Sequence, residues 1–132
     1  TRGPVIASHS NARGACFHLR NLSDEMIRQL AERGGVTGIN FCPSFLREEE
    51  PATKKASTMD MVRHMKYLRN VGGIDIIGLG TDFDGFSGET DVPDTAHMQH
   101  LADVMSHDGF TDEEIEKVFS KNVLRVFREC WK

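Results

Sequence analysis

The stretch "PVIASHSNARG", residues 4–14, begins with apolar residues and continues with a histidine, polar residues and glycine. Its apolar residues Val5, Ile6 and Ala7 predict a short buried strand, and polar residues follow from His9 onward. Proteins built on parallel α/β folds place their chemistry at the carboxyl ends of the strands. His9 therefore stands where a fold of this kind would carry a site.

Two more segments repeat this pattern of an apolar run that ends in polar groups. They are "VTGINF", residues 36–41, and "IDIIGLGTDFDG", residues 74–85, and each predicts a strand. Between the strands the apolar residues recur with helical spacing, so strand and helix alternate. Alternation of this kind predicts an α/β protein with a parallel sheet. Helices are expected in residues 21–35, 57–71, 96–105 and 110–130.

Several helix ends are marked by capping residues. Ser23 is a good N-cap, and Leu22 with Ile27 has the spacing of a hydrophobic staple. Thr111 and Glu114 form the pattern of a capping box. The stretch "CPSFLREEEPATKKA", residues 42–56, is expected to be a polar loop, longer than most connections in compact domains.

Bulk composition sets limits on the class of protein. The 132 residues are enough for one domain, and a composition of 39% hydrophobic and 27% charged residues is typical of a globular protein. A net charge of -4 gives no reason to expect nucleic acid as a partner, and no apolar run reaches the ~20 residues of a membrane helix. Three scattered cysteines without a CxxC pair favour reduced thiols and a cytoplasmic location.

Four residues carry candidate chemistry. A strand-end imidazole such as His9 is a good zinc ligand, although one histidine alone also fits a hydrogen-bonded residue at the rim of the core. Asp82 and Asp84, two residues apart, fit a metal ligand or a general acid/base, and equally a simple acidic turn. Arg20 fits a fork onto a substrate carboxylate, or a solvated surface residue.

The remaining histidines have weaker patterns. His18 resembles Arg20 in its loop position, and the other four are expected at the surface. "GLGTDFDG" lacks the last glycine of GxGxxG, which excludes a dinucleotide site of that type. The four histidines expected at the surface are His64, His97, His100 and His107.

Taken together, the motifs resemble the membrane dipeptidase family, the renal dipeptidase-like group of zinc peptidases. The similar segments are "SHSN" at the end of a strand, then "RNLSDE", then a "GxNF" strand, then "G-x-DFDG", closed by "KNVLRVF". The resemblance covers nearly the whole chain. It implies a (β/α) barrel with a binuclear zinc centre at the carboxyl ends of its strands. It also implies hydrolysis of dipeptides, with a D-residue accepted at the C-terminal position.

The resemblance implies a role for each candidate residue. His9 is similar to the zinc-ligating histidine of the sixth barrel strand. Arg20 is similar to the arginine that holds the terminal carboxylate of the substrate. Asp82 is similar to the eighth-strand acid that contacts the substrate amine and handles the proton. Asp82 is thereby expected to be both catalytic and substrate-binding.

The chain also departs from the family pattern. A barrel of this kind needs about 250 residues, and the first-strand HxD ligands, the bridging glutamate and the fifth-strand histidine are not found in residues 1–132. We therefore expect the C-terminal segment of a (β/α)8 barrel, about strands six to eight plus terminal helices, inactive by itself. Its unpaired strand edges predict a homo-oligomer or association with the missing N-terminal half. The alternatives are another metal-dependent amidohydrolase barrel and a non-catalytic binding module.

Overall fold

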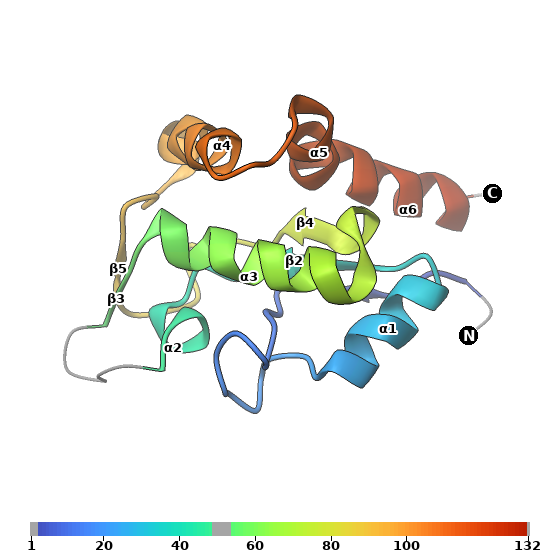
Figure 1. Ribbon diagram of the computed structural model, residues 1–132, viewed down its shortest axis with the longest axis horizontal. Helices are drawn as coiled ribbons and strands as arrows, with labels where there is room; N and C mark the ends of the chain where they lie inside the picture. Colours follow the sequence, from blue (N-terminus) through green and yellow to red (C-terminus); the bar gives the residue numbers. More distant parts are fainter. Residues whose placement is uncertain (1–2, 49–53, 132) are drawn as a thin grey trace.

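Three short parallel strands form the centre of the molecule (Figure 1). The computed structural model describes residues 3–48 and 54–131. Strands β1 (Ile6–Ala7), β2 (Val36–Ile39) and β4 (Ile77–Leu79) lie in the order β1-β2-β4. Ile6 is in register with Val36, and Thr37 with Ile77. These strands confirm the predicted alternation of strand and helix and the mixed α/β class.

Helices surround the sheet on three sides. The longest, α3, lies across the strands, while α4, α5 and α6 run along one side and α1 and α2 along the other (Figure 1). None of the helices in residues 3–48 and 54–131 is long and apolar enough to cross a membrane. The helices are α1 (Asp24–Glu32), α2 (Pro43–Leu46), α3 (Thr58–Gly72), α4 (Met98–His107), α5 (Asp112–Glu116) and α6 (Asn122–Cys130), with 3-10 turns at Ile74–Ile76 and Thr95–His97.

The predicted caps are present at the helix starts. The Ser23 hydroxyl accepts the N–H of Met26, and Thr111 and Glu114 form a complete capping box. Each cap satisfies backbone N–H groups that the first turn of a helix leaves unpaired. A π-helical turn, Lys117–Lys121, joins α5 to α6, so the last unit is a single irregular helical run.

The expectation of a plain polar loop over residues 42–56 is wrong. Proline at the first helical position starts the short helix α2. Strand β3 (Lys55–Ala56) follows and pairs in parallel with β5 (Glu89–Thr90) in a second, two-stranded sheet. Residues 49–53, the middle of this stretch, lie outside the described part of the chain.

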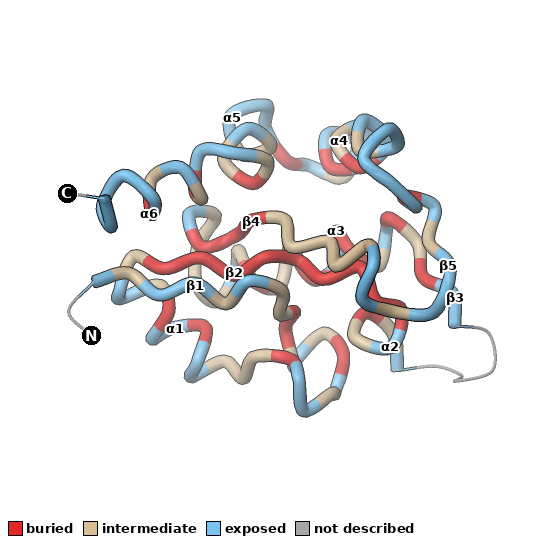
Figure 2. The backbone as a smooth tube through the Cα atoms, turned by 180° about the vertical axis from the view of Figure 1, so that it is seen from behind, coloured by how far each residue is buried: buried red, intermediate tan, exposed pale blue. Residues whose placement is uncertain are grey.

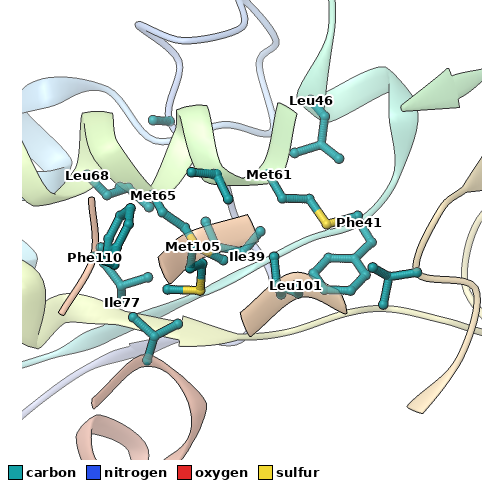
Figure 3. Close-up of a cluster of buried hydrophobic side chains, with 14 of the residues drawn as sticks. Ile39, Phe41, Leu46, Met61, Met65, Leu68, Ile77, Leu101, Met105 and Phe110 are labelled. Atoms are coloured by element: carbon teal, nitrogen blue, oxygen red, sulfur yellow. The ribbon is translucent and has the colours of Figure 1, made fainter. Parts of the chain in front are cut away.

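The hydrophobic core fills the space between the sheet and the helices α3 and α4. Methionine and leucine side chains of α3 point toward the strands, and two residues of α4 close the cluster from the side (Figure 3). Burial of such side chains stabilises the fold by about 1.5–3 kcal/mol each. The central members are Ile39, Phe41, Met61, Met65, Leu68, Ile77, Leu101 and Met105.

The opposite face of the sheet differs from the helix-covered face. In the view from behind, no described helix crosses in front of the three strands, and β2 is buried along its length (Figure 2). Strand β1 lies at the edge of the sheet, and its Ile6 remains 42% exposed. Val5, just before this strand, is 38% exposed. An exposed apolar edge strand is a template for pairing with another strand.

Candidate functional site

The carboxyl ends of the three strands are brought together by glycine. A Cβ atom at Gly38 of β2, or at Gly80 just after β4, would clash with the carbonyl oxygen of Ser8. Glycine at both positions therefore lets the end of β1 pack directly against its neighbours. This close approach places the segment of His9 beside the segment that leads to Asp82.

His9 follows β1 by two residues and is partly exposed. Its Nδ1 lies 2.7 Å from the hydroxyl oxygen of Ser8. Its other ring nitrogen, Nε2, forms no hydrogen bond with residues 3–48 or 54–131. When a histidine binds a metal through Nε2, a hydrogen-bond partner at Nδ1 usually fixes the orientation of its ring.

The described residues do not complete a metal site around His9. No cluster of three or more His, Cys, Asp or Glu side chains suited to a metal occurs within residues 3–48 and 54–131. A stable zinc site takes three or four protein ligands. The described residues around His9 therefore supply too few donors for a stable zinc site.

Asp82 lies in a tight turn beyond β4. Its backbone φ is 60°, and its carbonyl oxygen accepts the N–H of Gly85 at 2.9 Å. A Cβ at Gly85 would clash with the Asp82 carboxylate, so glycine here lets that carboxylate lie against the turn. Since β4 ends at Leu79, Asp82 and Asp84 lie in this turn and outside the strand. Asp84 is exposed in the same turn.

The sequence analysis missed two buried asparagines, Asn11 and Asn40. The Asn40 amide nitrogen donates to Asp82 Oδ2 at 3.2 Å. Asn11 in turn donates to the Asn40 carbonyl at 2.9 Å and accepts the Asn40 N–H at 2.8 Å. Both asparagines stand in the motifs "SHSN" and "GxNF", but their pairing spans 29 residues of sequence and left no local signal.

Arg20 lies in the loop between β1 and α1 and is exposed. Its guanidinium carbon is 5.6 Å from the ring centroid of Phe45 in α2, within cation–π range. The His18 ring packs on the same Phe45 ring at 4.6 Å. Arg13 closes the loop by donating to the carbonyls of Asn21 and Leu19, both at 3.1 Å. The loop therefore holds Arg20 in place while its charge stays accessible.

The three candidate residues occupy one end of the sheet without touching one another. No hydrogen bond or ion pair joins His9, Arg20 and Asp82, all of which lie in the described part of the chain. They are linked indirectly, because Asn11 belongs to the same loop as His9 and Arg20 and binds Asn40, which binds Asp82.

His64 was expected at the surface, and this expectation is wrong. The residue is 0% exposed. Its Nδ1 accepts the N–H of Ala12 at 3.2 Å, and its Nε2 lies 3.1 Å from the carbonyl oxygen of Leu46. Burial, assisted by the charge of Arg63, lowers the pKa of His64 to about 4, although the Leu46 carbonyl and Asp60 oppose this effect. His64 is therefore a neutral bridge between the β1 loop and α2.

The other histidines of the predicted surface set are exposed. His97 lies 2.7 Å from Asp94, and His100 lies 3.5 Å from Asp91. His107 is exposed at the end of α4. These contacts are ordinary surface pairs and add no donor near His9.

The sequence of this chain matches a known protein family and several known proteins. The model of a family described as membrane dipeptidase, peptidase family M19, matches residues 1–131. A protein of Klebsiella pneumoniae from the region 5' of pqqA is 35% identical over 97% of this chain and 47% of its own length. An uncharacterized dipeptidase of Schizosaccharomyces pombe is 34% identical over 98% of this chain and 31% of its own length. The dipeptidase tcpJ of Claviceps purpurea is 35% identical over 96% of this chain and 29% of its own length.

Solved structures of metallo peptidases are also similar to this chain. A metallo peptidase from Rhodobacter sphaeroides, liganded with a phosphinate mimic of the dipeptide L-Ala-D-Ala, superposes with a TM-score of 0.92 at 29% identity. The match covers 99% of this chain and 37% of that chain. A second metallo peptidase of family M19, described as dipeptidase AC, also has a TM-score of 0.92 at 29% identity, over 99% of this chain and 39% of its own. The chain thus spans less than half the length of each of these relatives.

Proposed function

This chain belongs to the membrane dipeptidase family, and we propose that it forms the C-terminal part of a metal-dependent dipeptidase. In this proposal β1, β2 and β4 are strands six to eight of a (β/α)8 barrel. One observation carries the proposal. His9, Arg20 and Asp82 all follow the carboxyl ends of parallel strands, at one end of a sheet that superposes on dipeptidase structures.

Each residue receives a role that its surroundings support. Arg20 is accessible and positively charged, and it binds the terminal carboxylate of a dipeptide with a fork of hydrogen bonds. Asp82 binds the substrate amine and passes a proton to the leaving nitrogen. Between them lies the peptide bond to be cleaved. The substrate class follows the relative that binds an L-Ala-D-Ala mimic.

His9 is proposed as one ligand of a binuclear zinc centre. Its free Nε2 and the oxygen of Ser8 near Nδ1 suit a metal-binding imidazole. When bound, zinc polarises the substrate carbonyl and supplies a hydroxide at neutral pH. The remaining ligands are assigned to other strands of the whole barrel, because the described residues of this chain form no cluster of three donors.

The edge of the sheet supports the proposal that this chain associates with a further part of a barrel. Val5 and Ile6 are exposed at the edge, and a groove of about 290 Å³ runs between β1 and α1. Its apolar lining includes Ala7, Leu22 and Leu30. We expect the isolated chain to pair through this edge, with itself or with an N-terminal half, and to bind no stoichiometric binuclear zinc.

The test uses a protein that carries this chain together with the rest of the barrel. Hydrolysis of L-Ala-D-Ala is measured as purified, after treatment with a chelator, and after zinc is restored. We expect activity that the chelator removes and zinc restores. Asp84→Asn provides a matched control for Asp82→Asn, because both carboxylates lie in the same turn and only Asp82 is assigned to the reaction. A zinc-loaded protein that cleaves no dipeptide would exclude the dipeptidase assignment and leave a binding module.

A further inference from the structure

We propose that Asn40 is a positioning residue for Asp82, and that its side-chain amide fixes the carboxylate that the dipeptidase reaction uses. This inference rests on the proposed function, since it assigns a partner to the acid of the same site. Asn40 follows directly after β2, and Asp82 lies three residues beyond the end of β4. The contact therefore joins the carboxyl ends of two neighbouring strands.

The Asn40 side chain has its two ends fixed by different partners. Its Oδ1 accepts the backbone N–H of Cys42 at 2.8 Å, and its Nδ2 donates to Asp82 Oδ2 at 3.2 Å. The Cys42 N–H is only a donor, so it determines which end of the amide carries the oxygen. Asn40 is 0% exposed, which excludes water as a ready substitute partner. The amide nitrogen consequently points at the carboxylate in one orientation.

Asn11 supports this arrangement from the loop that follows β1. Its amide donates to the Asn40 carbonyl at 2.9 Å and accepts the Asn40 N–H at 2.8 Å, so it clamps the backbone of Asn40 with two bonds. Asn11 is itself 0% exposed. Buried networks in which the members satisfy one another are rigid. The Asp82 carboxylate is therefore held in a fixed position relative to the loop that carries His9 and Arg20.

Asp82 combines a left-handed backbone with a carboxylate of which only one oxygen is bonded to a described residue. Its φ of 60° lies in the left-handed region, which an aspartate adopts only at some cost. Asn40 occupies Oδ2, while Oδ1 accepts no hydrogen bond from residues 3–48 or 54–131. Asn40 thus fixes one oxygen, and the other has no hydrogen-bond partner among the described residues and can accept from a substrate amine.

The test compares kcat and KM for L-Ala-D-Ala in the whole protein. Asn40→Asp keeps an oxygen for the Cys42 N–H but removes the donor to Asp82, and Asn40→Ser removes the amide without adding a charge. We expect each to lower kcat by about 10-fold or more, the loss typical of a bond to a charged group. If one of the two variants fails to fold, the other carries the same test.

A second background separates positioning from a merely structural role. In the Asp82→Ala protein there is no carboxylate to position, so replacing Asn40 there is expected to change kcat by less than about 2-fold. Asn122 gives a matched control, because it is also a buried asparagine. Its amide donates to the carbonyls of Ile74, before β4, and Ile77, the first residue of β4, both at 2.8 Å. Asn122→Ser is expected to lower stability and leave kcat of the folded protein unchanged.

The outcomes distinguish this inference from the function on which it rests. If Asp82→Ala lowers kcat while both Asn40 variants keep wild-type kcat, the positioning role is wrong and the dipeptidase assignment stands. If replacing Asn40 lowers kcat by the same factor in the Asp82→Ala background, the inference is also wrong, because Asn40 would then act without the carboxylate. If the metal-loaded wild type cleaves no dipeptide, the proposed function fails and the inference fails with it.

Discussion

Replacing His64 by leucine removes the hydrogen bond between its buried imidazole, on α3, and the backbone of the loop that follows β1. The Ala12 N–H donates to Nδ1, which must therefore be unprotonated, and the proton lies on Nε2 facing the Leu46 carbonyl. In His64→Leu the Leu46 carbonyl keeps Arg63 as a donor at 2.6 Å. The Ala12 N–H loses its acceptor, and we expect a cost of about 1–3 kcal/mol at pH 7.

The pH dependence follows from the lowered pKa of His64. In the folded protein the pKa of His64 is about 4, and in the unfolded chain it returns to the usual 6.5. Below pH 6.5 the unfolded state binds a proton that the folded state rejects, so the free energy of unfolding falls as the pH falls. Between pH 7 and pH 5 this single group lowers the stability by about 2 kcal/mol, and the effect levels off below pH 4.

Urea unfolding at pH 7, 6 and 5 measures this contribution as a difference between proteins. The wild type is expected to lose about 2 kcal/mol more than His64→Leu from pH 7 to pH 5. His107→Gln is the control, because it removes an exposed imidazole and leaves the His64 contribution in place. Parallel stability curves for the wild type and His64→Leu would refute the reasoning, since His64 would then titrate alike in both states.

The remaining predictions concern the residues assigned to the reaction. His9→Ala is expected to remove one metal ligand and most activity, and an unchanged zinc content by metal analysis would contradict the assignment. Asp82→Asn is expected to keep the metal and lower kcat, whereas loss of activity only in Asp84→Asn would identify the other carboxylate as the acid. Arg20→Ala is expected to weaken transition-state binding of a free dipeptide by roughly 1.5–3 kcal/mol, and by much less for a dipeptide amidated at its C-terminus. Equal losses in kcat/KM for both substrates would instead assign Arg20 a structural role.

Local patterns predicted the strands and the helix ends well. Short apolar runs specified β1, β2 and β4, and the spacing of Thr111 and Glu114 specified a capping box, because these interactions involve residues close in sequence. The same reasoning failed for residues 42–56, where β3 forms only by pairing with β5, more than thirty positions further along the chain. Pairing over such a separation leaves no periodic signal.

The residues of the candidate site divide in the same way, into those marked by a local motif and those that depend on contacts distant in the sequence. His9, Arg20 and Asp82 were predicted as site residues because each stands in a recognisable motif. Asn40 was missed because its contact with Asp82 joins residues 42 positions apart in the sequence. His64 was misjudged although a signal existed.

The missed signal for His64 lies in its helix. It falls on the same face of α3 as Met61 and Leu68, three residues after one and four before the other, so the 3.6-residue period already placed it in the core. A polar residue on an apolar face of this kind must have hydrogen-bond partners. The structure supplies them from Ala12 and Leu46.

A crystal structure of a whole protein carrying this chain, bound to a phosphinate mimic of L-Ala-D-Ala, would show whether His9, Arg20 and Asp82 meet at one substrate. We expect His9 Nε2 on the metal beside the phosphinate, the Arg20 guanidinium on the terminal carboxylate, and Asp82 Oδ1 on the amine of the mimic. A mimic bound with none of these three side chains in contact, at another end of the sheet, would contradict the proposed function.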